Sequence, residues 1–406
     1  MWFDYSKGQA EKPISEYELI KQGRFSISSS LWNELVARFS KEEIIAHFTS
    51  LIETLEFPFR IYSEIEVKED WLSLLTEPSI LRHGEWVSDR IQGISDLTYL
   101  GSPLYLKGSN RGLKVSDQYT QPARMACGHE RYKSPLNQWT RAPFKDKTRY
   151  LLNPLFSIMK DVCAQRGFGD DEIFNCLRLY SFMASQFKPS VAKSLYDFFG
   201  AKRVLDFSAG WGDRLVGFLA SGAESYVGID PNTQLHEPYQ KIVDWVSPNK
   251  KVQMVCQPAE DVNFSDYTYD FVFTSPPYFD TERYSEEPTQ SWKRYEGEQA
   301  WLEGFLLNTL RRAWVHLEEG GRMAINISDV FSTQVEGSYK IVCKPMLEYM
   351  ENLGATYEGV IGYPLSKLPG TKLKQEAQLL CEPIFVWSKG RAVKPSWDHS
   401  DYFFEV

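Results

Sequence analysis

A short apolar run over residues 271–274 ends abruptly in Ser275, Pro276, Pro277 and Tyr278. Two consecutive prolines supply no N–H groups to a strand ladder, and their rings fix the backbone where the strand stops. The Ser275 hydroxyl and a proline carbonyl would then be two fixed acceptors, with the Tyr278 ring beside them. Two acceptors can grip the hydrogens of a planar amine and aim its lone pair at an electrophile, while the ring stacks on the plane. We expect these four residues to be catalytic; the alternative is a strand-ending turn with a packed tyrosine.

A glycine-containing loop earlier in the chain has the features of a ligand-binding loop. It follows an apolar run that ends in Asp206, and Gly210 and Gly212 allow the backbone to approach a ligand closely. The next run ends in Asp230, where a carboxylate can accept both hydroxyls of a ribose, and the third leads to Asp261, which can accept from an adenine amine. The loop has no lysine in a P-loop pattern. The alternative for Asp206 and Asp230 is helix capping or ion pairing.

In this order, the Asp206 loop, Asp230 and Asp261 resemble the S-adenosylmethionine motifs of the class I methyltransferases, over about residues 187–389. Residues 187–190 resemble the segment that precedes the glycine loop in DNA amino-methyltransferases. The loop departs from that family, which usually has a Pro-Phe pair and a small residue where this chain has Phe207, Ser208 and Trp211. The resemblance implies that S-adenosylmethionine is the cofactor. It assigns cofactor binding to Lys188, Pro189, Asp206, Ser208, Ala209, Gly210, Gly212, Asp230, Pro231, Asp261 and Ser275.

The turn at Ser275 resembles the signature of methyltransferases that act on planar amino groups, and its serine is typical of the DNA cytosine-N4 branch. Adenine-N6 enzymes more often have Asp or Asn at this position. The resemblance therefore implies methylation of an exocyclic base amine, with cytosine N4 in DNA favoured over adenine N6. RNA, a protein side-chain amide or a small molecule stays open as acceptor, as does a binding module without turnover. The absence of a Pro-Cys dipeptide removes the usual nucleophile of cytosine-C5 methylation.

Short β-branched or aromatic runs alternate with helical patterns after about residue 151, which predicts a doubly wound, seven-stranded Rossmann-like α/β sheet. With 406 residues we expect an N-terminal accessory domain over 1–150, a catalytic domain over 151–390 and a tail over 391–406. A capping box at Ser40 predicts a helix after it. The expected strands are 203–206, 225–229, 252–256, 271–274, 322–327, 356–362 and 383–388, with helices at 191–199, from about 214, and at 299–317.

Residues 107–149 are rich in basic and aromatic side chains, with ten Lys or Arg against three Asp or Glu. Such a mixture suits phosphate contacts and base stacking, so we expect a nucleic acid, most of all DNA, as the partner. A solvated basic connector is an equal alternative. Its prolines and glycines predict a loop-rich segment. Residues 280–295 predict a polar and aromatic loop that could close over the substrate, with an ordered surface loop as an equal alternative. The basic loop that carries Lys367, Lys372 and Lys374 lies on a plausible substrate path, but a solvated loop is the favoured interpretation.

The composition is that of a globular protein, with 43% hydrophobic and 24% charged residues and a net charge of −9. No apolar stretch approaches the roughly 18 residues of a membrane span, and the first residues show no signal-peptide pattern. The six cysteines are scattered singly, which suits free thiols and argues against a structural zinc site. We therefore expect a cytoplasmic protein without a metal.

Overall fold

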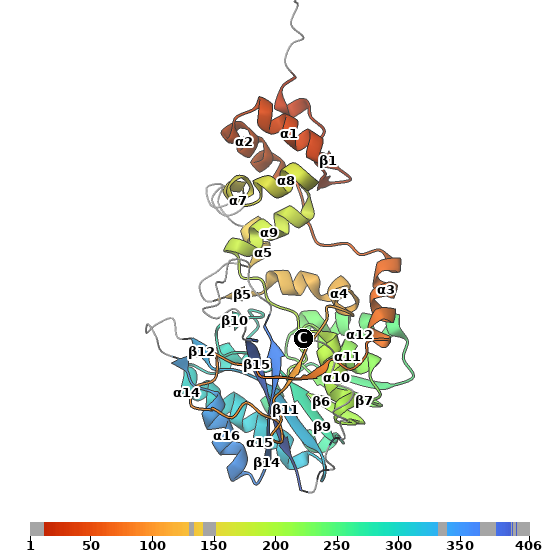
Figure 1. Cartoon of the computed structure of the whole chain (residues 1–406), viewed down its shortest axis with the longest axis vertical. Helices are drawn as coiled ribbons and strands as arrows, with labels where there is room; N and C mark the ends of the chain where they lie inside the picture. The colour runs from red at the N-terminus through yellow and green to blue at the C-terminus, as the bar shows by residue number, and fades with distance from the viewer. Residues whose placement is uncertain are drawn as a thin grey trace, which may run out of the picture. The chain divides into compact units, whose positions relative to one another are not determined.

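The computed structural model describes residues 12–129, 134–140, 152–331, 339–365, 379–390, 392 and 395. The chain forms two compact units, each built from two separate stretches (Figure 1). The first unit comprises residues 1–61 and 125–184, and the second comprises 62–124 and 185–406. This division differs from the predicted boundary at residue 150, because residues 62–124 contribute two strands to the sheet of the second unit.

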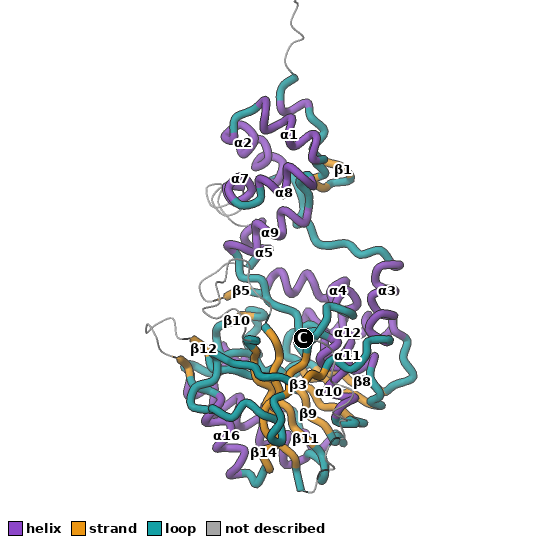
Figure 2. The backbone as a smooth tube through the Cα atoms, viewed as in Figure 1, coloured by secondary structure: helices purple, strands orange, loops and turns teal. Residues whose placement is uncertain are grey.

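The first unit is mainly helical (Figure 2). An aromatic cluster forms its core, in which the Phe48 and Phe168 rings stack at 5.4 Å and Trp32 packs beside them. The predicted capping box at Ser40 is confirmed, since Ser40 and Glu43 cap α2 reciprocally. The elements are η1 (Ile14–Glu16), β1 (Ile20–Lys21), β2 (Arg24–Phe25), α1 (Ser29–Arg38), α2 (Lys41–Ile52), β5 (Gly128–His129), α5 (Pro135–Thr140), α7 (Asn153–Ser157), α8 (Lys160–Arg166) and α9 (Asp170–Tyr180).

The second unit is built on a mixed sheet (Figure 1). Its nine strands lie in the order β3-β4-β14-β15-β11-β9-β6-β7-β8. The central strands run parallel, and β15 lies antiparallel between β11 and β14. The strands are β3 (Leu81–His83), β4 (Leu104–Leu106), β6 (Arg203–Asp206), β7 (Ser225–Ile229), β8 (Lys251–Val255), β9 (Phe271–Thr274), β11 (Arg322–Asn326), β14 (Thr356–Pro364) and β15 (Cys381–Ser388).

Helices cover both faces of this sheet, because side chains alternate along its strands. Phe271 and Phe273 of β9 contact Tyr196 of α10, whereas Val272 belongs to the core on the other face with α15 and α16. The helices and short turns are α3 (Glu64–Leu75), α4 (Leu113–Ala126), α10 (Pro189–Phe198), α11 (Asp213–Ala220), η3 (Thr233–Leu235), α12 (His236–Val246), η4 (Ala259–Asp261), η5 (Phe264–Asp266), α13 (Ser291–Arg294), α14 (Glu298–Trp301), η6 (Leu302–Leu307), α15 (Asn308–His316) and α16 (Cys343–Asn352), with short strands β10 (Glu282–Arg283), β12 (Val330–Phe331) and β13 (Tyr339–Lys340).

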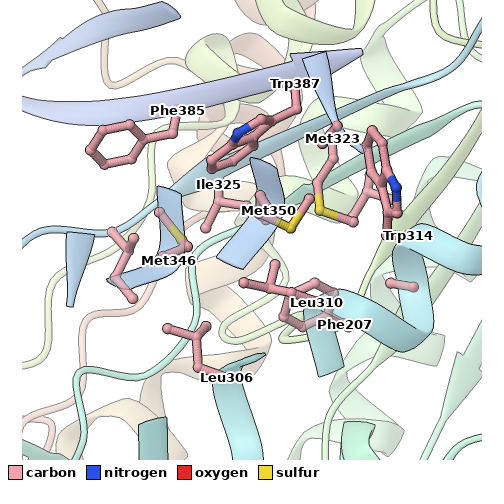
Figure 3. Close-up of a cluster of buried hydrophobic side chains, with 14 of the residues drawn as sticks. Phe207, Leu306, Leu310, Trp314, Met323, Ile325, Met346, Met350, Phe385 and Trp387 are labelled. Atoms are coloured by element: carbon pink, nitrogen blue, oxygen red, sulfur yellow. The ribbon is translucent and has the colours of Figure 1, made fainter. Parts of the chain in front are cut away.

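Figure 3 shows the core between the sheet and the helices that follow the Ser275 turn. Met323 and Ile325 of β11 face Leu310 and Trp314 of α15, and all but Trp314 are fully buried. Burial of side chains this large stabilises the unit by roughly 1.5–3 kcal/mol each. The core therefore fixes the ends of β6, β9 and β11 relative to one another.

The doubly wound α/β fold and all seven predicted strands are confirmed, each within two residues of its predicted bounds. The predicted helix at 299–317 is present but contains the π-helical stretch η6. Two sheet strands, β3 and β4, were not predicted, because runs of three residues give no period to detect. The expectation that residues 107–149 are loop-rich is wrong where they are described, since α4 and α5 lie within them.

Among the residues that the structure describes, none belongs to a helix with the length and apolar character that a membrane span requires.

Candidate active site

The glycine loop and the Ser275 turn leave the sheet side by side. Strands β6 and β9 are parallel neighbours, with Leu205 opposite Val272, so Asp206 and Thr274 both stand at the carboxyl edge. Strand β7 pairs with the other side of β6 and leads directly into Asp230. Ligands of doubly wound sheets bind outside this edge. The structure thus brings three predicted site segments together.

Asp206 is fully buried and its carboxylate is occupied by neighbouring side chains. It accepts a hydrogen bond from Nε of Arg214 at 2.7 Å, from the Tyr226 hydroxyl at 2.7 Å, and from the Ser208 amide at 3.2 Å. Arg214 also donates to the Ser208 carbonyl. Asp206 therefore anchors the loop from beneath, as the ion-pairing alternative anticipated.

The loop itself depends on two glycines with positive φ, 60° at Gly210 and 81° at Gly212. Asp230 stabilises it, because its carboxylate accepts from the Gly210 amide and the Asn232 amide, both at 2.9 Å. Burial raises the pKa of Asp230 to about 6, although these two amides act against the rise. The Ala209 amide is held by the Ile229 carbonyl at 2.9 Å. The two strand ends are thus tied together by main-chain groups.

Asp213, the first residue of α11, directly follows the glycine loop and was not among the predicted site residues. It is 2% exposed; its Oδ1 accepts from the Ser116 hydroxyl at 2.5 Å and from the Gln186 amide at 3.3 Å. Its Oδ2 is buried and has no hydrogen-bond partner among the described residues. Burial raises the pKa of Asp213 to about 7. Its place directly after Gly212 was the available signal.

Lys188 and Pro189 lie at the start of α10, where Pro189 is the first helical residue. Nζ of Lys188 donates to the Gly108 carbonyl at 3.1 Å, and burial lowers the pKa of this lysine. Ser190 Oγ donates to the Ser109 carbonyl and accepts from the Ser109 amide, each at 3.0 Å. Residues 108–109 therefore pack against the segment assigned to the cofactor.

The basic side chains of residues 107–149 are only partly described. Arg124 is buried and paired with Asp117 at 2.5 Å, so it does not present a charge at the surface. Lys114 and Arg111 form ion pairs with glutamates of the neighbouring segment. The other basic residues of this stretch after Arg124, namely Arg131, Lys133, Arg141, Lys145, Lys147 and Arg149, lie outside the described residues, as do Lys367, Lys372 and Lys374.

The proline turn carries polar groups that are buried without partners. Oγ1 of Thr274 and Oη of Tyr278 are both inaccessible and have no hydrogen-bond partner of normal geometry among the described residues. Ser275 and Pro277 are half-buried, and Pro276 is buried. Phe279 has a φ of 53°, a conformation that costs a non-glycine residue energy and is typical of functional sites. The turn is thus a rigid feature at the sheet edge.

The loop over residues 280–295 is ordered and reaches the ends of the neighbouring strands. Glu287 accepts from the Thr233 amide at 3.2 Å, and the Thr289 hydroxyl donates to the Pro231 carbonyl at 3.4 Å. Arg294 grips the Asp261 carboxylate through two hydrogen bonds of 2.8 and 3.0 Å. The predicted adenine contact of Asp261 must therefore share this carboxylate with Arg294.

Two carboxyl groups near Tyr278 were also missed by the sequence reasoning. Glu282 and Glu382 both act on the Tyr278 hydroxyl electrostatically, and burial raises the pKa of both carboxyls. Arg90 pairs with Glu382 at 2.8 Å. Nothing in the sequence around them marks these residues, since they are brought to the turn by β15 and by the loop after the turn.

The orphaned polar atoms at this sheet edge fit a polar ligand of the S-adenosylmethionine type. Buried donors and acceptors without partners are uncommon in native proteins. Four such atoms belong to residues at the end of β9 or in the segments that follow β6, β7 and β9: Oδ2 of Asp213, Nδ2 of Asn232, Oγ1 of Thr274 and Oη of Tyr278. A nucleoside joined to an amino acid carries complementary groups for such a set. Within the described ranges, no three His, Cys, Asp or Glu side chains cluster as a metal site.

No family model matches the chain, and no curated protein matches it. Among solved structures, it is similar to TehB from Haemophilus influenzae, with 12% identity over 49% of this chain and 61% of that one and a TM-score of 0.32. TrmN from Thermus thermophilus is 16% identical over 50% of this chain and 48% of its own, with a TM-score of 0.30. A SAM-dependent O-methyltransferase from Thermotoga maritima is 13% identical over 55% and 72%, with a TM-score of 0.32. The chain spans less than two thirds of TehB and of TrmN.

Proposed function

We propose that this chain transfers the methyl group of S-adenosylmethionine to an exocyclic amine of a nucleic-acid base, with cytosine N4 in DNA as the favoured acceptor. The observation that carries the proposal is the adjacency of two segments. The glycine loop after Asp206 and the turn from Ser275 to Tyr278 leave neighbouring parallel strands at the same sheet edge. A methyl donor held by the first would face an amine held by the second.

The residues of the turn would hold and aim the acceptor. An exocyclic amine shares its lone pair with the ring and is therefore a poor nucleophile. When its hydrogens are bound by the Ser275 hydroxyl and a proline carbonyl, the nitrogen is drawn toward a tetrahedral geometry and its lone pair is directed. The ring of Tyr278 offers a surface on which a base flipped out of a duplex can stack. No covalent nucleophile is needed.

The cofactor side would be formed by the loop from Ser208 to Gly212 and by the residues after β7 and β8. When bound, S-adenosylmethionine supplies a methyl group on a positively charged sulfur. Asp230 and Asn232 stand where ribose hydroxyls are expected in such sheets, and Asn232 has a buried amide nitrogen without a partner among the described residues. In the transfer a carbon–nitrogen bond forms, the carbon–sulfur bond breaks with its electron pair left on sulfur, and the methylated nitrogen releases a proton to solvent water.

Other acceptors are compatible with the same turn. Adenine N6 would use the same two acceptors, and so would an amine of RNA, a protein amide or a small molecule. The serine at position 275 is the feature that favours cytosine. A binding module without turnover is the remaining alternative, and the presence of Asp206, Asp230, Ser275 and Tyr278 argues against it.

The test is a methyl-transfer assay with Ser275→Ala and the matched control Ser265→Ala, an exposed serine of η5. Removing one of the two acceptors is expected to lower the rate about 100-fold or more, because the amine is no longer gripped on both sides. The affinity for S-adenosylmethionine should fall far less than the rate in Ser275→Ala and be unchanged in Ser265→Ala. Full activity of Ser275→Ala, with Ser265→Ala also active, would contradict the catalytic assignment.

A further inference from the structure

The three carboxylates around the glycine loop, Asp206, Asp213 and Asp230, differ in how many of their oxygens accept hydrogen bonds. Asp206 accepts from Arg214, Tyr226 and the Ser208 amide, which engages both of its oxygens. Asp230 accepts one main-chain amide on each oxygen. Asp213 alone of the three has a buried oxygen, Oδ2, that has no partner within the described residues. Of these three carboxylates, Asp213 is therefore the one with an acceptor oxygen that the described residues leave without a partner.

The other oxygen of Asp213 is held firmly from two directions. Ser116 of α4 donates to Oδ1 at 2.5 Å, and Gln186, just before α10, donates to the same atom at 3.3 Å. Both Ser116 and Asp213 are buried. The orientation of the carboxylate is thus fixed by residues outside the loop, one of which lies in the segment 62–124, and only Oδ2 is left for a ligand.

A buried carboxylate oxygen without a partner is costly unless a cation or a donor joins it. The charged groups that face Asp213 are Asp117 and Arg124 of α4 and its neighbour Arg214. Arg124 is paired with Asp117, and Arg214 is paired with Asp206, so both cations are already engaged. The amino-acid portion of S-adenosylmethionine carries an ammonium group with three donors. It is the chemical complement of this oxygen.

We propose that Oδ2 of Asp213 binds the α-ammonium group of the methionine portion of S-adenosylmethionine, and that Ser116 and Gln186 are positioning residues that orient this carboxylate. The inference rests on the proposed function and names a cofactor contact that the glycine loop itself does not supply. It also gives the segment around Ser116 a place in the cofactor site.

The experiment compares two ligands by isothermal titration calorimetry on the full chain. S-adenosylhomocysteine contains the ammonium group, whereas 5′-methylthioadenosine has the same nucleoside but no amino-acid portion. Asp213→Asn should weaken S-adenosylhomocysteine binding about 10- to 100-fold, the usual effect of losing a charged hydrogen-bond partner, and leave 5′-methylthioadenosine unchanged. Ser116→Ala should give a smaller loss with the same selectivity. Asp197→Asn, on a carboxylate of α10 that accepts from Gly222, should change neither ligand.

Binding of 5′-methylthioadenosine to Asp213→Asn shows that the variant is folded at the site. If that variant does not fold, the selectivity of Ser116→Ala decides the matter in the same way. If Asp213→Asn weakens the binding of both ligands equally, or of neither, the inference about Asp213 is wrong. The proposed function is unaffected by that result as long as the wild-type chain binds S-adenosylhomocysteine. A wild-type chain that binds neither ligand would refute the proposed function and this inference with it.

Discussion

Replacing Asp213 with asparagine should make the cofactor-free protein more stable at alkaline pH, an unusual outcome for a substitution at a binding site. The carboxylate is 2% exposed, and burial raises its pKa from 3.8 to about 7. Asparagine has the same shape, can still accept from Ser116 and Gln186 through its oxygen, and carries no charge. The substitution therefore removes the cost of burying an ion, whereas the amide NH2 that replaces the unpartnered Oδ2 adds a cost that does not depend on pH.

The sign of the pH dependence follows from the raised pKa. Between pH 3.8, the ordinary pKa of the carboxyl, and about pH 7, its pKa in the folded protein, Asp213 is protonated in the folded state but ionised in the unfolded state. The free energy of unfolding therefore falls as the pH rises through this range and becomes constant above about pH 7. At roughly 1.4 kcal/mol per pKa unit, the full cost is about 4 kcal/mol above pH 7 and about 1–2 kcal/mol at pH 5. The free energy of unfolding of Asp213→Asn, relative to wild type, should thus grow by roughly 2–3 kcal/mol between pH 5 and pH 8.5.

Urea unfolding at pH 5 and pH 8.5 measures this difference, with hydrogen exchange on peptides from β6 and β9 as the probe. That probe is needed because the chain has two compact units, and a single global signal would mix their transitions. The matched control is Asp197→Asn, whose carboxylate is 40% exposed. If the difference in free energy of unfolding between Asp213→Asn and wild type is the same at both pH values, the conclusion that Asp213 carries a buried charge is wrong.

Three further predictions concern the acceptor, the adenine contact and the sheet. Tyr278→Ala should raise KM about 10-fold or more through the loss of base stacking, whereas Tyr278→Phe, which keeps the ring, should retain KM; equal effects in steady-state kinetics would contradict a stacking role. Asp261→Asn should weaken S-adenosylhomocysteine and 5′-methylthioadenosine alike in calorimetry, because both carry adenine, and unchanged affinities would remove the adenine assignment. Glu358→Gln should destabilise the sheet unit by about 3–5 kcal/mol in urea unfolding, since it removes the negative charge that pairs with the buried Arg322 guanidinium at 2.8 Å; a change below about 1 kcal/mol would be inconsistent with that ion pair.

The sheet could be predicted from sequence because its central strands are apolar runs that end at polar residues, glycines or prolines. Asp206, Asp230 and the Ser275 turn each mark a strand end, and the structure places all three at one edge. Strands β3 and β4 could not be found, because they are short and join the sheet through β14, far along the chain. The boundary between the two units could not be predicted for the same reason, because each unit is built from two stretches that lie far apart in the sequence.

The roles of individual site residues were harder to predict, since they depend on contacts between distant segments. Asp206 looked like a ligand residue, but its oxygens are used by Arg214 and Tyr226. Asp213 was not among the predicted site residues, yet Ser116, which lies 97 residues earlier, donates to one of its oxygens, and the other oxygen has no partner among the described residues. Sequence spacing gives the order of strand ends, and only the packed structure shows which polar atoms are still available.

Nucleoside mass spectrometry after incubation of the protein with methyl-labelled S-adenosylmethionine tests the central claim most directly. Duplex DNA, single-stranded DNA and RNA are offered in parallel, with Ser275→Ala as the matched control. The proposed function predicts label in N4-methylcytosine from DNA, and none with the variant. Label confined to N6-methyladenine would keep the mechanism and correct the base, whereas no label in any polymer, despite measurable cofactor binding, would contradict a nucleic-acid acceptor.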